Sequence, residues 1–257
     1  MKKSYLPLVL LSLAIVDILL YVFKPLGENF YVIADILPIL NSFLALLLGF
    51  YVFKNYGFNN IQGKALFFIS LGLAFWFLGE TTWGIYEIIL GIETPSSSIA
   101  DVFWLLGYPC LLVGFYFLFK LTIIDYSKKR LFGLAILIIF VFYLTYYLVQ
   151  PTLTSTEMVW YNKITTAGYI VGDVLLITVL IILILQMSKS KFIKLWLIVL
   201  LAFIFTILAD IYYNNFIDIY QTGDFIDILW DLSYLLLAYG LFYHRIITKQ
   251  ILKQIKR

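Results

Sequence analysis

The chain has 257 residues, of which 63% are hydrophobic and only 13% are charged. Soluble domains are roughly 45–50% apolar and about 25% charged. The composition therefore excludes a water-soluble globular fold and makes lipid the solvent for most of the surface. One cysteine, Cys110, and one histidine, His244, are present. They exclude an intrachain disulfide and a His/Cys metal cluster, and we expect no metal ion, no cofactor and no nucleic-acid partner.

Eight apolar segments are long enough to cross a bilayer, since a spanning helix needs about 20 mostly apolar residues. They cover roughly residues 5–23, 31–53, 65–90, 101–124, 131–149, 165–187, 192–214 and 224–246. Polar residues and turn formers separate them. The sequence therefore predicts an all-α fold, a polytopic membrane bundle of about eight transmembrane helices over residues 1–246. A basic cytoplasmic tail helix is expected over residues 247–257.

The first segment also resembles a signal peptide, because it follows Met1-Lys2-Lys3. Asp17 interrupts its apolar run, and no pair of small residues with cleavage-site spacing precedes Lys24. These features favour a retained helix over a cleaved peptide.

Lysine and arginine predict the orientation of the bundle, because basic residues favour cytoplasmic connections. Sixteen of the 18 lie in the N-terminus, the even-numbered connections and the C-terminus. Lys24 and Lys163 are the two on the other side. We therefore expect a multi-pass protein of the plasma membrane with both termini in the cytoplasm, which requires an even number of helices.

An internal repeat is visible when the later helices are aligned. The fourth predicted helix matches the eighth in two short stretches, Asp101-Val-Phe-Trp-Leu-Leu-Gly-Tyr108 and Asp227-Ile-Leu-Trp-Asp-Leu-Ser-Tyr234. In the preceding helices, Glu80 corresponds to Asp210. Weaker anchors at Asp35 and Asn162 extend the pattern to the second and sixth helices. The alignment predicts four helical hairpins in parallel repeat.

Acidic residues show the opposite distribution to the basic ones. Apart from Asp125, they fall in the outer connections or in the outer halves of the predicted helices. Those within the membrane are Asp17, Asp35, Glu80, Glu87, Asp101, Asp173, Asp210, Asp227 and Asp231. A charge near the bilayer centre costs at least about 2.5–3.5 kcal/mol. These side chains are therefore expected to face the bundle interior or a water-filled cavity.

Two interpretations of these acids are open. Asp35, Asp101 and Asp227 begin predicted helices, where a carboxylate can cap free backbone N–H groups, and Ser98-x-x-Asp101 forms a loose capping box. The deeper acids can be held by Tyr and Trp as purely structural groups. Alternatively, the acids and aromatic residues line an outward-facing cavity, which would favour a cationic or protonatable ligand.

The sequence gives little support for the side-chain combinations that most often carry out catalysis. A serine–histidine–acid triad would need His244, which we interpret as an interfacial residue at the cytoplasmic end, far from the acids. No phosphate-binding glycine loop is present. Enzymatic activity stays uncertain, because a carboxylate-dependent membrane lipid enzyme remains an alternative.

The C-terminal residues 245–257 are basic, and Ile247, Ile251 and Ile255 recur four apart on one helical face. One interpretation is a helix end that touches anionic lipid. The other is a signalling helix that contacts a separate cytoplasmic partner.

The region 79–109 carries three short motifs: Trp83-x-x-Tyr86-Glu87, Pro95-Ser leading to Ala100-Asp101, and Leu105-x-x-Tyr108-Pro109. This pattern resembles the multi-helix membrane domains at the N-terminus of bacterial diguanylate cyclases and of archaeal and bacterial sensor histidine kinases. The resemblance implies a sensory input module. It matches Glu80, Trp83, Tyr86, Glu87, Asp101, Tyr108 and Pro109 to family positions.

The leading expectation is a non-enzymatic membrane sensor or ligand-binding module. Its candidate ligand-binding residues are Glu80, Trp83, Tyr86, Glu87, Asp101, Tyr108, Asp173, Asp210 and Asp227. Because no kinase or cyclase follows the last helix in this sequence, we expect any output to pass through a separate protein or to be absent. A cation or proton-coupled solute transporter is the second alternative, since parallel repeats with intramembrane carboxylates are compatible with transport.

Overall fold

The computed structural model describes residues 5–94, 97–122, 127–187, 190, 192–216 and 219–255. These residues form eight helices that are long and apolar enough to cross a membrane. They are α1 (Leu6–Phe23), α2 (Phe30–Phe53), α3 (Ile61–Gly84), α4 (Ile99–Phe119), α5 (Lys128–Thr154), α6 (Trp160–Gln186), α7 (Ile193–Phe216) and α8 (Ile228–Ile255). Three short elements adjoin them: 3₁₀ turns η1 (Gly27–Asn29) and η3 (Phe225–Asp227), and a π-helical segment η2 (Ile85–Ile89). The predicted all-α membrane bundle is confirmed.

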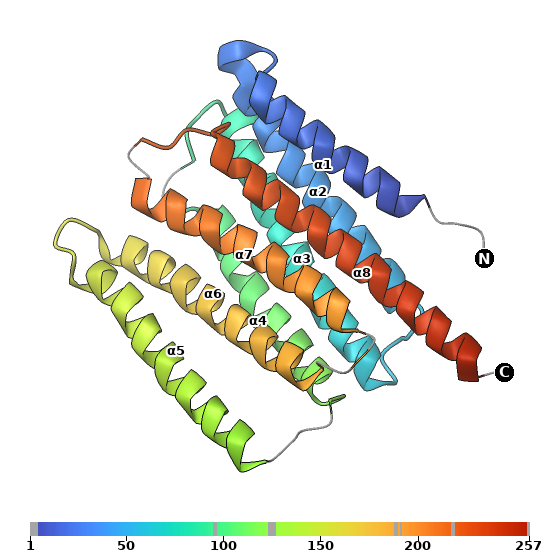
Figure 1. The fold of residues 1–257 in the computed structure, drawn as a ribbon. Coiled ribbons are helices and arrows are strands. Elements are labelled where there is room, and N and C mark those ends of the chain that lie inside the picture. Colours follow the sequence, from blue (N-terminus) through green and yellow to red (C-terminus); the bar gives the residue numbers. More distant parts are fainter. Residues whose placement is uncertain are drawn as a thin grey trace.

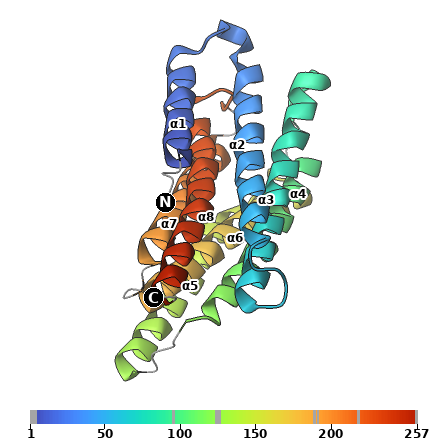
Figure 2. The same cartoon turned by 90° about the vertical axis from the view of Figure 1, so that its right-hand side faces the viewer.

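Six of the helices form a closed ring. Each packs against its two neighbours in the order α2, α3, α4, α6, α7 and α8, and α8 closes the ring against α2. The other two helices lie outside the ring, with α1 against α8 and α5 against α6. Figures 1 and 2 show α1 and α5 at separate edges of the bundle. The ring is therefore the part of the fold that can enclose a site.

The ring has the two-fold pattern expected of a repeat. Helix α2 packs against α3 and α8, and its counterpart α6 packs against α7 and α4. The hairpin α3–α4 likewise corresponds to α7–α8. The peripheral helices break this pattern, because α1 packs on α8 whereas α5 packs on its own hairpin partner α6. The contacts agree with a repeat of two halves, residues of α1–α4 and of α5–α8.

The two ends of the bundle differ in charge. We call the end with the α1–α2, α3–α4, α5–α6 and α7–α8 connections the acidic end. The opposite end, here the basic end, holds the α2–α3, α4–α5 and α6–α7 connections, and α1 begins and α8 ends there (Figure 1). Its described basic residues include Lys54, Lys64 and Lys120. Several residues used in the sequence argument lie outside the described part, namely Lys2, Lys3, Pro95, Ser96, Asp125, Lys189, Lys191, Lys256 and Arg257.

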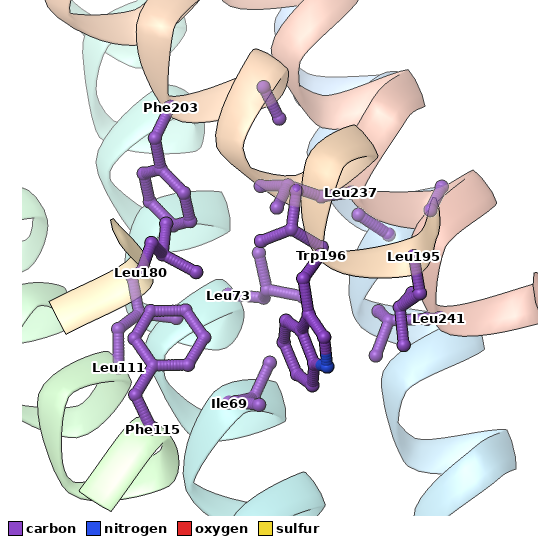
Figure 3. Packing of buried hydrophobic residues seen from close by; sticks show 14 of the residues in the cluster. Ile69, Leu73, Leu111, Phe115, Leu180, Leu195, Trp196, Phe203, Leu237 and Leu241 are labelled. Atoms are coloured by element: carbon purple, nitrogen blue, oxygen red, sulfur yellow. The ribbon is translucent and has the colours of Figure 1, made fainter. Parts of the chain in front are cut away.

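An apolar layer fills the ring on the basic side of its centre. Figure 3 shows Leu and Phe side chains from α3, α4, α6, α7 and α8 converging on the ring of Trp196. Phe115, Phe203, Leu73 and Leu111 are each at most 1% exposed in this layer. Burial of this kind contributes about 1.5–3 kcal/mol per large side chain in a soluble protein, and in a bilayer close packing takes over that role.

The tail predicted at residue 247 is continuous with the last helix, because α8 runs without a break to Ile255. Ile247 is buried, and the Arg245 guanidinium lies 4.2 Å from the centre of the Tyr51 ring. His244 is at the basic end, as expected, but it is buried and hydrogen-bonded to Gln62 at 3.0 Å. The side chain of Ile255 lies outside the described part of the chain. Arg245, Ile247 and Thr248 thus contact the bundle, whereas Lys249 and Gln250 are exposed.

Candidate functional site: an acidic and aromatic cavity

A cavity of about 110 Å³ lies inside the acidic half of the ring. All six ring helices contribute to its wall, together with the connection that precedes α8. Five carboxylates line it: Asp35, Glu80, Asp101, Asp210 and Asp227. Nine aromatic side chains complete most of the wall: Trp76, Trp83, Trp104, Tyr108, Tyr169, Tyr213, Tyr220, Trp230 and Tyr234. The cavity therefore has the acidic and aromatic character that the sequence predicted.

Two of the carboxylates are held by indole groups of neighbouring helices. Trp104 donates its Nε1–H to Glu80 Oε1 at 3.1 Å, and Trp230 donates its Nε1–H to Asp210 Oδ1 at 2.8 Å. Glu80 also accepts a hydrogen bond from the Tyr234 hydroxyl of α8. The expectation that the deep acids meet Tyr and Trp is confirmed. They do so at the wall of the cavity, where these hydrogen bonds join neighbouring helices.

Asp101 is a helix cap as well as a cavity residue. Its Oδ2 accepts a hydrogen bond from the backbone N–H of Ser98 at 2.6 Å, and the two residues form a reciprocal capping box at the start of α4. The other oxygen, Oδ1, accepts a hydrogen bond from the Tyr169 hydroxyl at 2.8 Å. Both oxygens are occupied, so this carboxylate mainly fixes the α4–α6 contact.

Asp35 does not begin a helix, contrary to the sequence prediction. Helix α2 begins at Phe30, after the 3₁₀ turn η1, so Asp35 lies more than one turn inside it. It is 3% exposed, and its Oδ2 atom is buried without a hydrogen-bond partner. Trp83 lies beside it. Asp35 is thus an acceptor on the cavity wall with an unused oxygen, although it was absent from the predicted ligand-binding set.

Asp227 combines a local role with a free oxygen. Its Oδ2 accepts a hydrogen bond from the backbone N–H of Gly223 at 2.8 Å, which closes the turn before α8. Its Oδ1 is buried and makes no hydrogen bond of normal length, although the Tyr220 side chain lies beside the carboxylate. The neighbouring Tyr220 lies outside the spans, and burial together with the charge of Asp227 holds the pKa of Tyr220 well above its usual value. Tyr220 therefore remains a neutral hydroxyl donor at the cavity.

Asp173 lies behind the cavity wall. The Tyr108 hydroxyl donates to Asp173 Oδ1 at 2.6 Å, and Asp173 also interacts with Asp210. Tyr108 is itself on the wall, whereas Asp173 is not among the lining residues. Asp173 and Asp210 therefore interact with each other directly, and only Asp210 of the two lines the cavity.

Tyr86 and Glu87 are the other predicted ligand-binding residues that do not line the cavity. They belong to the π-helical segment η2, which changes the direction of side chains at the end of α3. Glu87 approaches the Thr94 hydroxyl at 3.5 Å. The structure thus groups six of the nine predicted residues at the cavity: Glu80, Trp83, Asp101, Tyr108, Asp210 and Asp227.

The wall also contains residues that were not predicted as ligand-binding. Trp104, Trp230 and Tyr234 belong to the repeated stretches of the fourth and eighth helices, so the repeat itself carried their signal. Tyr169 has a weaker signal, because the repeat aligns Gly168-Tyr169 with Gly107-Tyr108, whereas Trp76 and Tyr213 had no comparable sequence signal. These side chains reach the wall because of the orientation of each helix about its own axis, which is set by packing within the ring.

The charges at the cavity are one-sided. Among the described residues that line it, five are acidic and none is Lys, Arg or His. In the same described part of the chain, no group of three or more His, Cys, Asp or Glu side chains is arranged to hold a metal ion. A low-dielectric site with unbalanced carboxylates and aromatic faces attracts an organic cation, because both groups bind positive charge.

No protein-family model, curated protein or solved structure matches the chain. The fold and the cavity are therefore the basis on which we interpret its function.

Proposed function

We propose that the chain is a membrane-embedded sensory module that binds a small organic cation in the cavity at its acidic end. In this proposal the basic end faces the cytoplasm, in agreement with the distribution of lysine and arginine. The observation that carries the proposal is the cavity wall, which combines five carboxylates with nine aromatic side chains and includes two buried oxygens, on Asp35 and Asp227, that have no partner.

The size of the cavity suggests the size of the ligand. A cavity of roughly 150 Å³ holds benzene in an engineered protein, so about 110 Å³ suits an ammonium group with a few carbon atoms. Trp76, Trp83 and Trp230 offer aromatic surface, and a cation over such a ring gains about 2 kcal/mol or more when it is desolvated. Asp35 and Asp227 then supply negative charge beside any organic cation and, for a primary amine, unused acceptors for its N–H groups.

The apolar layer favours binding over passage. On the basic side of the cavity, Leu73, Leu111, Phe115 and Phe203 close the ring with side chains that cannot solvate a cation (Figure 3). A continuous polar path is therefore not present among the described residues of the ring interior. This arrangement supports a module that captures a ligand and responds with a helix movement.

Helix α8 is the element that we propose as the output. Asp227, at the turn before it, and Trp230 and Tyr234 within it lie at the cavity, and the same helix continues to Ile255 at the basic end. A shift of the first turn of α8 on ligand binding would therefore reach residues 245–255 through one rigid element. A separate cytoplasmic signalling protein that contacts this basic segment would read the shift.

A transporter for a cation or a proton-coupled solute is the second candidate. It is favoured by two irregular positions beside the cavity, Pro38 within α2 and the π-helical segment η2 that follows Trp83. Both kinds of irregularity allow a helix to bend. Flux of a labelled cation into proteoliposomes would support the transporter, whereas binding without flux would support the sensor.

The test compares a cation with an uncharged molecule of the same shape. Choline and 3,3-dimethylbutan-1-ol differ in the charged nitrogen, and each is added to purified protein in detergent while the unfolding temperature is measured. Binding to the folded state alone must raise stability, by about 2.7 kcal/mol at a ligand concentration of 100 Kd. Choline, tetramethylammonium and primary amines form the first panel, with Na⁺ and Mg²⁺ beside them.

Two variants and one control locate the binding. Asp35→Asn and Asp227→Asn should remove most of the stabilisation by the cation, because they delete the charges with unused oxygens. Glu28→Gln is the control, since Glu28 is an exposed acid at the same end of the bundle. A response to the uncharged analogue equal to that of choline, or an unchanged response in both cavity variants, would contradict the proposal.

A further inference from the structure

A second buried polar cluster lies between α1, α2 and α8, apart from the cavity. Asn41 of α2 donates both hydrogens of its amide, one to Asp17 Oδ2 at 2.9 Å and one to Asp231 Oδ1 at 3.2 Å. Asp17 is 2% exposed, Asp231 is 0% exposed and Asn41 is 4% exposed. None of the three lines the cavity. One amide thus holds two carboxyl groups close together in the interior of a membrane bundle.

The cluster has unused binding atoms. Asp231 Oδ2 and the Tyr21 hydroxyl are both buried without a hydrogen-bond partner, and Tyr21 is 1% exposed. The Tyr21 side chain lies beside Asp231 and faces the same space between α1 and α8. These two oxygens lie on neighbouring side chains and make no hydrogen bond of normal length, which is unusual because buried polar atoms are nearly always satisfied.

Among the described residues, no basic side chain forms an ion pair with Asp17 or Asp231. Lys24, at the end of α1, lies over the Phe30 ring, with its Nζ 5.9 Å from the ring centre. The helices α1 and α2 contain no Lys, Arg or His, and the first basic residue after Asp231 in α8 is His244, about 20 Å further along the helix. Glu80 acts electrostatically on Asp231, and Asp227 acts on the neighbouring Tyr21, so both add negative charge to the cluster. Two ionised carboxylates this close repel each other strongly in a low-dielectric interior.

We propose that Asp17 and Asp231 together bind one monovalent cation, either a proton or an alkali-metal ion, in a site completed by Asn41 and Tyr21. One positive charge removes the repulsion between the two carboxylates and leaves a pair that acts as a unit. An alkali-metal ion finds oxygen ligands on both carboxylates and on the tyrosine hydroxyl, which is the ligand type that hard cations prefer. The proposal does not rest on the organic cation of the main cavity.

The experiment measures the unfolding temperature of the full chain in nanodiscs as the pH and the cation are varied. N-methylglucamine chloride serves as the reference salt, because this ion is too large for the site, and NaCl or KCl replaces it at equal ionic strength. The variants are Asp17→Asn and Asp231→Asn, each nearly identical in shape to the wild type, and Glu28→Gln is the matched control. Each amide variant removes one charge of the pair and therefore the need for a cation.

In the wild type and in Glu28→Gln, we expect the unfolding temperature to fall as the pH rises in N-methylglucamine, when the proton leaves and both carboxylates are charged. Restoration by Na⁺ or K⁺ would identify an alkali-metal ion as the occupant, and no restoration would identify the proton. In Asp17→Asn and Asp231→Asn, both responses should be smaller than in the wild type, and the part that remains belongs to the carboxylates of the cavity. The variants should also be at least as stable as the wild type at high pH in N-methylglucamine.

Two outcomes would overturn the proposal. Equal responses to pH and to Na⁺ in the wild type and in both amide variants would show that the pair binds no cation. Failure of both variants to fold at high pH in N-methylglucamine would show that folding requires both carboxylates in their ionised form, without a cation bound between them.

Discussion

Trp104 donates its indole N–H to Glu80 across the α3–α4 hairpin, and the same bond joins Trp230 to Asp210 across the α7–α8 hairpin. These four residues occupy the positions that the internal repeat aligns. Because the two bonds lie on opposite sides of one ring, the repeat places a tryptophan–carboxylate pair on each side of the cavity. The acids that were read as ligand-binding residues therefore also join adjacent helices.

Trp104→Phe should lower the free energy of unfolding by about 1–3 kcal/mol, because Glu80 loses one of its two hydrogen-bond donors inside the bundle. Denaturant unfolding in detergent measures the change. A double-mutant cycle with Glu80→Gln isolates the Trp104–Glu80 coupling from the effect of the smaller ring.

The control for this change is Trp160→Phe, since Trp160 is 72% exposed and lies outside the cavity wall. It should change stability by less than about 0.5 kcal/mol. A coupling energy near zero between Trp104 and Glu80 would show that the repeated bond contributes nothing measurable to the fold.

Gly107 allows α3 and α4 to approach closely at the cavity floor. A methyl group at this position would come within 2.3 Å of the Trp76 ring, which is far inside contact distance. Gly107→Ala should therefore destabilise the protein by about 1–3 kcal/mol through overpacking and displace Trp76, which lines the cavity.

Gly133→Ala provides the matched comparison, because a methyl group there meets nothing within 4 Å. In a helix this change should be neutral or slightly stabilising, by up to about 1 kcal/mol. Denaturant unfolding measures the free energy of unfolding of both variants. Equal changes in Gly107→Ala and Gly133→Ala would mean that the close approach of α3 and α4 is not required for stability.

The sequence predicted the helices well because long apolar runs leave few alternatives in a bilayer, as the segments of α2 and α7 show. It also indicated that the acids gather at one end. It could not predict that Asp35 would offer a free oxygen while Asp101 would have both oxygens occupied, because that depends on which side chains of other helices come near. The cluster of Asp17, Asn41 and Asp231 joins three helices, and no local pattern indicates it.

Tryptophan fluorescence should report ligand binding directly. Four of the six tryptophans line the cavity, and Trp196 and Trp160 do not. A cation that enters the cavity should therefore change the emission of most indole groups, whereas the exposed Trp160 contributes a constant background. Titration of choline into the wild type and into Trp160→Phe should give the same binding curve. A signal that disappears in Trp160→Phe would place the binding outside the cavity.

The basic end of α8 should be held by a small number of contacts that can be removed without unfolding the bundle. The Tyr56 hydroxyl donates to Thr248 Oγ1 at 2.8 Å, which ties α8 to the α2–α3 connection, and Arg245 lies over the Tyr51 ring. Tyr56→Phe removes one hydrogen bond, which is worth about 0.5–1.5 kcal/mol. Amide hydrogen exchange in residues 245–255 should therefore become several-fold faster while exchange in the core of α3 and α4 stays unchanged. Tyr31→Phe, at the acidic end, serves as the control, and unchanged exchange in Tyr56→Phe would show that this bond does not hold the helix in place.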